Sequence, residues 1–383
     1  MRGESVSLDT KIFAKGSRYW SETKIYQDPV SLQKAYESGL AGVWRNPEAN
    51  ARLREYNKQL TGYGSIEEAA HGNGWADSGA GKLVIPFVHV MLAYPGCWPG
   101  PAQEVGDCVS HDTKNAVLGS MVCEVVSGKP DEVSGLTEGL PEVSPDGIRN
   151  GVLSTEAIYW WRRHSGDGWS CGEACEVIQK ESGLWVRKNY EDLGIDLTEY
   201  SGNLAHKYGS NPPTGKIAES GKLHLARAFA EAKSNEEKRD ALANGYFLST
   251  CGGESYEKTR DKYGFSKQTR EGWSHAMAYV AWDDRPEIVK VFGEPLALDL
   301  NSWNEWNSGP RDIWDSAKYV PSSQRDLWVK CDIVNPTTGN IMIPKGSMWV
   351  LASTSRQRDC WAISSVNGWP RKKLPDWGGS LFG

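Results

Sequence analysis

Three residues far apart in the chain have side chains that could together carry out nucleophilic chemistry: Cys108, His275 and Asn301. A thiol becomes a strong nucleophile as a thiolate, which a helix N-terminus or a neighbouring imidazolium stabilises. An imidazole can take the thiol proton and pass it to a leaving amine. An amide oxygen can orient the imidazole ring, as a carboxylate does in serine triads. This set of residue types therefore indicates acyl transfer through a covalent intermediate.

The sequence around Cys108 predicts a helix that begins at the thiol. Gly106-Asp107 permits a turn, and residues 108–121 could then continue as a helix. Cys108 would lie in the first turn, at the positive end of the helix dipole, where the pKa of a thiol is lowered. We therefore expect Cys108 to begin a long, buried helix.

The other two residues lie in blocks that predict neighbouring strands. His275 is followed by the apolar, strand-like run 276–280, and Asn301 opens the sequence Asn-Ser-Trp. The segment between them is long enough for two strands joined by a turn. Trp303 lies two residues after Asn301, so its indole could cover the imidazole–amide hydrogen bond and keep water away from it.

These blocks resemble those of the papain-like cysteine peptidases, most specifically in the Asn-Ser-Trp sequence downstream of the His-Ala block. Weaker similarity lies at residues 152–157, at the glycine-containing turn 168–172 and at a helix-like stretch over 173–181, so the resemblance covers about residues 95–310. Family members typically carry the histidine and the asparagine roughly 130–150 residues after the cysteine. Here both lie further along the chain, so we expect insertions.

The resemblance implies a role for each matching residue. Cys108 would be the nucleophile, His275 the acid and base, and Asn301 the residue that orients the imidazole. The backbone amide of Cys108 and the side chain of Gln103 would stabilise the oxyanion. Gly172 would lie in the substrate-binding turn.

The match departs from the family pattern at several positions. Gln103 lies five residues before the cysteine, where the family glutamine lies six before it. The aromatic residue that follows the family cysteine is Val109 here, the glycine after Asn-Ser-Trp is Asn304, and the disulfide cysteine of secreted members is Val105. These changes fit either a divergent peptidase or a protein that kept the scaffold and lost the activity.

The resemblance implies an α+β papain-like fold, with a helical half, a β-sheet half and the active-site cleft between them. We expect an N-terminal helical arm or accessory region over 1–82, either a propeptide or an assembly arm, and the papain-like domain over 83–320. Gly, Pro and Ser content predicts surface insertions near 127–151 and 194–221. Residues 321–383 should form a β-rich extension that ends in a tail rich in Trp, Pro and Gly.

Local patterns predict further elements. Proline at the start and Gly62 just past the end predict a helix over 47–60, and residues 28–36 also begin like a helix. Three apolar runs predict strands: 82–94, 327–334 and 348–353.

Composition excludes several classes of function. The 383-residue chain is 24% charged and 39% hydrophobic, which is typical of a globular protein. Its net charge of −6 provides no basic surface for nucleic acid. No apolar run is long enough to span a membrane, and the N-terminal sequence lacks the apolar core of a signal peptide. We therefore expect no nucleic-acid or membrane partner, and a cytoplasmic or virion location.

The 8 cysteines and 18 tryptophans each allow a functional and a structural interpretation. Cys171 and Cys175 are four residues apart and could share a helical face around zinc, but no Cys-x-x-Cys or paired histidine completes a ligand set. Buried thiols are the favoured interpretation, and we expect neither a metal nor another cofactor. The tryptophans could form a sugar- or protein-binding surface, but core and loop anchoring is favoured.

Two other functions also fit the sequence. The chain could be a catalytically weak or inactive papain-fold structural or assembly protein, such as a tailed-bacteriophage virion component, bound to neighbouring subunits. It could also be a cysteine hydrolase of cell-wall peptidoglycan, since Asp107-Cys108 followed by small residues is similar to those enzymes. The favoured interpretation is a peptidase with a peptide or protein substrate.

Two further sets of residues are weaker candidates. His111 lies three residues after Cys108 and could be a base, but residues at this spacing on one helix favour a packing or surface role. Asp283-Asp284 could line a cleft and select basic substrates, but a solvated turn is the favoured interpretation.

Overall fold

The structure is a computed structural model that describes most of the chain after residue 41. The described residues are 42–43, 45–96, 98–127, 152–182, 184–223, 225–270, 275–303, 307–355, 359–364, 368–372 and 374. The predicted helix at 28–36 and nearly all of the predicted insertion at 127–151 lie outside them.

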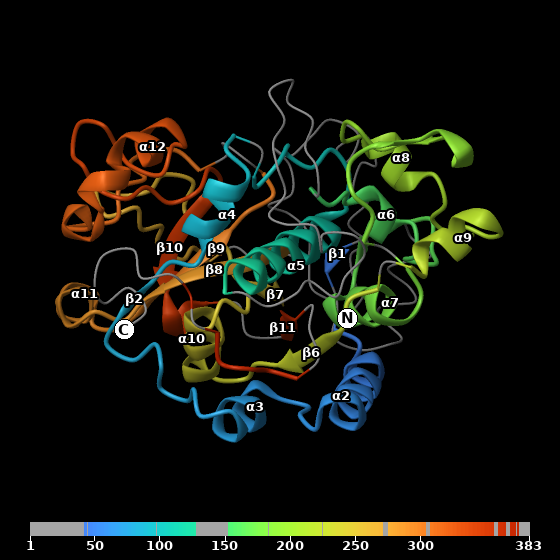
Figure 1. Cartoon of the computed structure of the whole chain (residues 1–383), viewed down its shortest axis with the longest axis horizontal. Helices are drawn as coiled ribbons and strands as arrows, with labels where there is room; N and C mark the ends of the chain where they lie inside the picture. The colour runs from blue at the N-terminus through green and yellow to red at the C-terminus, as the bar shows by residue number, and fades with distance from the viewer. Residues whose placement is uncertain are drawn as a thin grey trace, which may run out of the picture.

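An antiparallel sheet forms one half of the described fold (Figure 1). Its seven strands run in the order β10-β9-β8-β7-β11-β6, and β2 pairs with β8. The strands are β2 Leu83–Val84, β6 Ala228–Glu231, β7 Leu248–Gly252, β8 His275–Asp283, β9 Leu296–Leu300, β10 Ser347–Leu351 and β11 Asp359–Ser364. Two short ladders accompany it, β1 Gly42–Val43 with β3 Gly168–Trp169 and β4 Asn189–Tyr190 with β5 Ile195–Asp196.

Helices make up the other half and also cover the sheet. The α-helices of the described residues are α2 Pro47–Thr61, α3 Ile66–Gly72, α4 Phe87–Ala93, α5 Cys108–Val126, α6 Glu156–Tyr159, α7 Cys171–Lys180, α8 Gly202–His206, α9 Lys216–Gly221, α10 Asn235–Ala243, α11 Pro286–Phe292 and α12 Arg325–Lys330. Short 3-10 turns lie at η3 Glu191–Leu193, η5 Ala317–Tyr319, η6 Ser322–Gln324 and η7 Ala352–Thr354. In Figure 1, α5 crosses the centre, with β8 to β10 on the left and α6 to α9 on the right. The predicted α+β fold, with a helical half and a β-sheet half, is confirmed.

The two faces of the sheet pack into two hydrophobic clusters. In β8, Ala276, Ala278 and Val280 face the cluster that contains α5, whereas Met277 and Tyr279 face the cluster that contains α10. Side chains along a strand alternate between its faces, so this apolar run is buried on both sides. The predicted strand after His275 is thus a central strand of the sheet.

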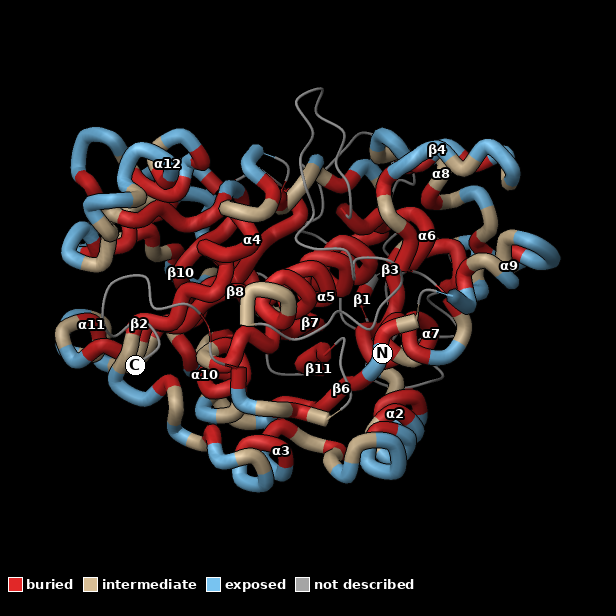
Figure 2. Tube along the Cα trace, in the orientation of Figure 1, coloured by how far each residue is buried: buried red, intermediate tan, exposed pale blue. Residues whose placement is uncertain are grey.

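The helix α5 is the buried axis of the molecule, coloured as buried along almost its whole length in Figure 2. It has apolar residues all round and is buried from Cys108 to Glu124, as expected for a helix enclosed by other elements. Its polar residues bond to neighbouring elements. Ser120 accepts a hydrogen bond from the backbone N–H of Phe247 at 2.9 Å, and Glu124 forms a buried ion pair with Lys372 at 3.2 Å. These contacts fix α5 against the sheet half.

The predicted helix over 47–60 is confirmed as α2. Asn46 caps it by accepting a hydrogen bond from the backbone N–H of Ala49 at 3.0 Å, and proline occupies its first position. Gly62 ends it with a φ of 85°, a left-handed conformation that glycine adopts without strain. The proline at the start and the glycine just past the end thus predicted both ends of this helix.

Two strand predictions were wrong. The run 82–94 forms only the short strand β2 and then α4, which starts directly after Pro86. The run 327–334 lies partly in α12 instead of a strand. Both runs are short and apolar, and such runs do not distinguish a buried strand from a buried helix. The run 348–353 was predicted correctly, since most of it lies in β10.

The division into three regions stays a prediction, and the structure adds one observation to it. β10 and β11 come from the predicted C-terminal extension, yet β10 pairs with β9 and β11 lies between β7 and β6. The C-terminal strands are therefore part of the main sheet. Among the described residues, no helix has both the length and the apolar character needed to cross a bilayer.

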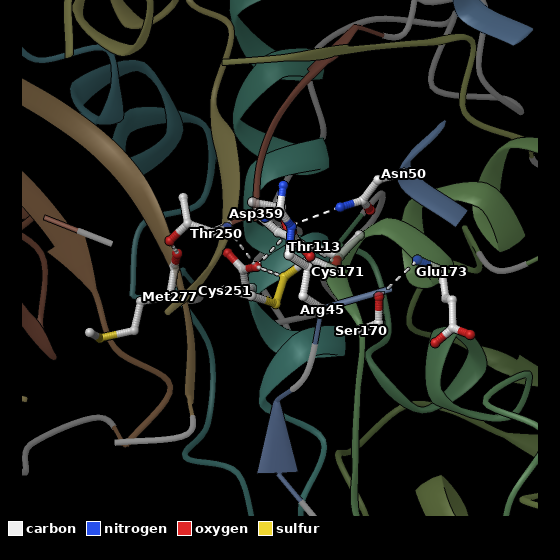
Figure 3. The surroundings of a disulfide bond; sticks show 12 residues. Arg45, Asn50, Thr113, Ser170, Cys171, Glu173, Thr250, Cys251, Met277 and Asp359 are labelled. Atoms are coloured by element: carbon white, nitrogen blue, oxygen red, sulfur yellow. Dashed lines mark hydrogen bonds and ion pairs between the residues drawn. A yellow bond between two sulfur atoms is a disulfide. The ribbon is translucent and has the colours of Figure 1, made fainter. Parts of the chain in front are cut away.

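A disulfide between Cys171 and Cys251 joins the helical half to the sheet half (Figure 3). Cys171 opens α7 and Cys251 lies in β7, 80 residues later. The interpretation of Cys171 as a buried thiol was therefore wrong, because its partner is distant in sequence and only the fold brings the two together. Cys175, one turn further along α7, is a buried thiol as predicted.

Candidate active site

The secondary structure places the three predicted catalytic residues at the ends of adjoining elements. Cys108 is the first residue of α5 and is 1% exposed. His275 is the first residue of β8, on which α5 packs. Asn301 directly follows the last residue of β9, the antiparallel neighbour of β8. The helix and the sheet thus meet where these residues lie.

His275 and Asn301 form a hydrogen-bonded pair. The His275 Nε2 atom lies 2.9 Å from the Asn301 Oδ1 atom. The same oxygen accepts a hydrogen bond from the backbone N–H of Trp303 at 3.0 Å, which fixes the orientation of the amide. Because an amide oxygen can only accept, the imidazole carries its proton on Nε2 in this bond. Proton exchange with a thiol would then use Nδ1, the other ring nitrogen.

Trp303 covers this pair. Its ring stacks on the His275 ring with 4.3 Å between the centroids and 25° between the planes. Trp303 and Asn301 are both buried, and His275 is 0% exposed. A hydrogen bond shielded from water is electrostatically stronger than an exposed one. The indole therefore lies where it can stabilise the orientation of the imidazole.

Gln103 ties the turn before Cys108 to the sheet side of the site. Its backbone N–H donates to the carbonyl oxygen of Ser302 at 3.0 Å, and the Ser302 hydroxyl donates to Gln103 Oε1. Its Nε2 donates to the carbonyl oxygen of Val105 at 2.9 Å. One of the two amide hydrogens is thus used within the turn. The predicted oxyanion role of Gln103 stays a prediction.

Gly172 has a packing role in this structure. It is the second residue of α7 and is buried, and a Cβ atom there would collide with the side chain of Asn50 from α2. The glycine therefore permits the close approach of α2 and α7. Its predicted contact with substrate stays a prediction.

The burial of the site restricts access to it. Since Cys108 and His275 are both nearly inaccessible to solvent, an extended peptide reaches the thiol only after the chain around it moves. In the described structure the thiol and the imidazole are therefore closed to solvent.

Both of the weaker candidates have polar partners within the fold. His111 is buried, and its Nε2 lies 3.5 Å from Asp107 Oδ2. Asp283 is not in a solvated turn, so that prediction was wrong: it is buried and forms two hydrogen bonds with the Arg285 guanidinium, at 2.8 and 2.7 Å. Burial raises the pKa of Asp283 in spite of this partner. Asp284 accepts a hydrogen bond from the backbone N–H of Gly81 at 2.8 Å.

The residues that bond to the turn before Cys108, residues 104–107, were not recognised from the sequence. We call this segment the nucleophile turn. Tyr200, which lies in the insertion predicted near 194–221, forms hydrogen bonds with Glu104 and Asp107 of this turn. Asp167 and Tyr159 bond to Gly106 within it. No local pattern marks these residues, because their partners are more than 50 positions away in the chain. The predicted insertion is therefore a structural support of the site as well as a surface segment.

The described residues contain no group of three or more His, Cys, Asp or Glu side chains that could hold a metal ion. Cys171, the one member of the considered Cys pair that lies in a disulfide, has no thiolate to offer a metal.

Comparisons with known proteins give similarity of fold only. No protein-family model matches the sequence, and no curated protein is a significant match. Solved structures similar to this chain include xylellain, a cysteine protease from Xylella fastidiosa, at 15% identity over 68% of this chain and 80% of that chain, with a TM-score of 0.38. Procathepsin B S9 from Trypanosoma congolense is 9% identical over 75% of this chain and 78% of that chain, with a TM-score of 0.40.

A third similar structure is the digestive procathepsin L 3 of the Tenebrio molitor larval midgut, 11% identical over 88% of this chain and 99% of that chain, with a TM-score of 0.34. At these identities and scores, what this chain does has to be argued from its own residues.

Proposed function

We propose that this protein is a papain-like thiol peptidase that hydrolyses peptide or related amide bonds through a Cys108 acyl-enzyme. The observation that carries the proposal is the His275–Asn301 hydrogen bond beneath Trp303. The turn before Cys108 is bonded to Ser302, the residue between Asn301 and Trp303. The imidazole, the amide and the indole are thus joined to one another, and the turn before the thiol is bonded to the segment that carries the amide and the indole.

The proposed reaction has two steps. In the first, the Cys108 sulfur attacks the substrate carbonyl carbon and the thiol proton passes to His275. His275 then donates that proton to the leaving amine as the C–N bond breaks, leaving a thioester. In the second, water attacks the thioester carbonyl and gives a proton to His275. That proton returns to the sulfur as the acid product leaves, which restores the thiol.

Two features of the helix side would stabilise charge in this reaction. The N-terminus of α5 carries partial positive charge, which favours the Cys108 thiolate. Backbone N–H groups in the first turn, with the remaining amide hydrogen of Gln103, would donate to the oxyanion of the tetrahedral intermediate. Asn301 would hold the imidazole ring in place through both proton transfers.

The test is hydrolysis of fluorogenic peptides by the purified full chain, compared with Cys108→Ser and with Cys331→Ser. Cys331 is also a buried thiol, but it lies just after α12. We expect hydrolysis by the wild-type chain and by Cys331→Ser, and none by Cys108→Ser. Rapid quenching followed by mass spectrometry should detect the acyl group on the peptide that contains Cys108. Hydrolysis that survives Cys108→Ser would refute the proposal.

The burial of Cys108 and His275 favours a second candidate, a papain-fold structural or assembly protein with a silent site. Such a protein would bind neighbouring subunits, as in a phage virion, and would hydrolyse no peptide. The discriminating result is a wild-type chain whose Cys108 reacts no faster with thiol reagents than its other cysteines. Cell-wall hydrolysis stays a prediction, tested by adding purified peptidoglycan to the same assay.

A further inference from the structure

One tyrosine hydroxyl holds the turn before Cys108 from outside. The Tyr200 hydroxyl oxygen accepts a hydrogen bond from the backbone N–H of Glu104 at 3.0 Å. The same hydroxyl donates to Asp107 Oδ2, also at 3.0 Å. A single oxygen atom thus joins the two ends of the segment 104–107, which leads directly into the candidate nucleophile.

The Asp107 carboxylate needs this donor. Asp107 is the N-cap residue of α5, but its side chain makes no capping hydrogen bond and is fully buried. A buried carboxylate without a hydrogen-bond donor is costly. The His111 Nε2 atom lies 3.5 Å from Asp107 Oδ2, so the Tyr200 hydroxyl is the closer donor. Burial, and after it the negative charge of Asp107, raises the pKa of Tyr200, so the hydroxyl keeps its proton.

The segment that carries Tyr200 is itself anchored. The backbone N–H of Ser201 donates to Glu156 Oε1 at 3.0 Å. Glu156 in turn forms a buried ion pair with Arg187, at 3.1 Å between the carboxylate and the guanidinium. The His111 ring meets the Tyr200 ring edge-on, with 5.0 Å between the centroids. The hydroxyl is therefore presented by a fixed ring on a fixed backbone.

A second contact joins the same segment to the turn. The backbone N–H of Gly202 donates to Glu104 Oε2 at 3.0 Å. A Cβ atom at Gly202 would lie only 2.8 Å from the Val105 side chain, so Gly202 packs against that side chain more closely than a residue with a Cβ atom would without a shift. The segment that carries Tyr200 therefore both packs against the turn and forms hydrogen bonds with it.

The opposite side of the turn is held by other residues. The Gly106 carbonyl oxygen accepts hydrogen bonds from the Tyr159 hydroxyl at 3.1 Å and from the backbone N–H of Gly168 at 2.9 Å. The Gly106 N–H donates to Asp167 Oδ1 at 3.2 Å. With this side fixed, loss of the Tyr200 contact would remove the one hydroxyl that joins Glu104 to Asp107 across the turn.

We propose that Tyr200 is a positioning residue for the Cys108 nucleophile, acting through Glu104 and Asp107. The inference rests on the proposed function, because positioning affects a rate only if the thiol reacts. A displacement of about 1 Å at a reacting atom can cost roughly a hundredfold in rate. Tyr200 would contribute at this level without touching substrate.

The test compares Tyr200→Phe with Tyr190→Phe. The Tyr190 hydroxyl also donates one hydrogen bond, to the Val186 carbonyl oxygen at 3.1 Å, but it does not contact the turn. We expect Tyr200→Phe to lower kcat and the rate of Cys108 alkylation by about tenfold or more, with KM changed by less than about twofold. Tyr190→Phe should match the wild-type chain in both rates. A purely structural role for Tyr200 would lower the melting temperature of the variant and leave kcat of the folded fraction unchanged.

Substitutions at Asp107 test the same hydrogen bond from its acceptor end, with a conservative variant that keeps the acceptor. Asp107→Asn keeps an oxygen that can accept from Tyr200, whereas Asp107→Ala removes it. We expect Asp107→Asn to retain most of the alkylation rate and Asp107→Ala to lose it to the same extent as Tyr200→Phe. If Tyr200→Phe does not fold, Gly202→Ala provides a second route, because its added methyl group would press against Val105 and displace the segment.

Hydrogen exchange separates this inference from the proposed function. Faster exchange at the Glu104 amide in Tyr200→Phe, with slower alkylation, supports the inference. A Tyr200→Phe variant with wild-type kcat, alkylation rate and exchange overturns it and leaves the peptidase proposal intact. If the wild-type chain shows neither hydrolysis nor selective alkylation of Cys108, the proposed function fails. In that case unchanged Glu104 exchange in Tyr200→Phe overturns the positioning role as well.

Discussion

The sheet side and the helix side of the candidate site are held in place by different means. On the sheet side, His275 forms a hydrogen bond with Asn301, which lies 26 positions later at the end of the neighbouring strand. The backbone N–H of Trp303 donates to the same Asn301 side chain, two positions away. On the helix side, Glu104 and Asp107 bond to Tyr200, 96 and 93 positions away. The sheet side is therefore assembled from nearby chain, whereas the helix side depends on a distant insertion.

The two sides of the site differ in how much of the chain each one needs. The whole His–Asn–Trp arrangement lies within residues 275–303. The turn before Cys108 depends on Tyr200 and Gly202, although both lie in a segment that looks dispensable from its sequence. Substitutions on the two sides should therefore affect different measurable quantities.

The largest effect is expected on the sheet side, at His275. His275→Ala removes the proton acceptor and donor and should lower kcat/KM for peptide hydrolysis by about 10²–10⁴-fold. Its control is His71→Ala, since His71 is an exposed residue in the last turn of α3. Measured kinetics that show equal activity for His275→Ala and His71→Ala would remove His275 from the mechanism.

A smaller effect is expected at Trp303. Trp303→Ala removes the indole stacked on His275 and should lower kcat by about tenfold, because the imidazole loses part of its fixed orientation. The loss of a buried tryptophan should also lower the free energy of unfolding by about 3–5 kcal/mol. Trp303→Phe keeps a stacked ring and should lose less of both. Activity of Trp303→Ala equal to that of Trp303→Phe at a temperature where both are folded would contradict the orienting role.

The disulfide between the helical half and the sheet half of the fold should affect stability. Replacing Cys171 and Cys251 together by serine should lower the free energy of unfolding by about 2–4 kcal/mol, since the bond closes a long loop. Denaturant unfolding with and without reductant measures this directly. The double variant should be insensitive to reductant. A wild-type chain whose unfolding is unaffected by reductant would show that the bond does not stabilise the fold.

The last expected effect, on the pH dependence of stability, comes from Asp359, the first residue of β11. Asn50 donates to Asp359 at 2.7 Å and Arg45 lies 3.2 Å away, but burial dominates and raises the pKa of Asp359 to about 7. The folded state therefore binds a proton more tightly than the unfolded state, whose aspartate pKa is about 3.9. The resulting stability is fully present below about pH 4 and is lost as pH rises through about 7.

Asp359→Asn should remove this pH dependence, because asparagine neither loses a proton nor takes on a charge. The melting temperature of the variant should fall less than that of the wild-type chain between about pH 4 and pH 7. Parallel curves for the two proteins would show that Asp359 does not titrate in the folded state over this range.

The sequence predicted what is specified locally. The start of α5 at Cys108, the strand after His275 and the ends of α2 follow from turn signals, apolar runs and caps. The strand prediction over 82–94 failed because an apolar run of that length suits α4 equally well. The Cys171–Cys251 disulfide and the role of Tyr200 could not be predicted, because both arise from contacts between distant segments that only the complete fold brings together.

The most direct test of the central claim is the alkylation of Cys108 by iodoacetamide near pH 6, with the rate at each cysteine followed by peptide mapping. Burial raises the pKa of Cys123 to about 12 and raises the pKa of the Cys175, Cys331 and Cys360 thiols as well. These four should therefore react very slowly, whereas a thiolate paired with the His275 imidazolium reacts at this pH.

We expect Cys108 to be modified first in the wild-type chain and to lose that preference in His275→Ala. A native chain in which Cys108 reacts no faster than Cys123, Cys175, Cys331 and Cys360 would contradict the working thiol–imidazole pair.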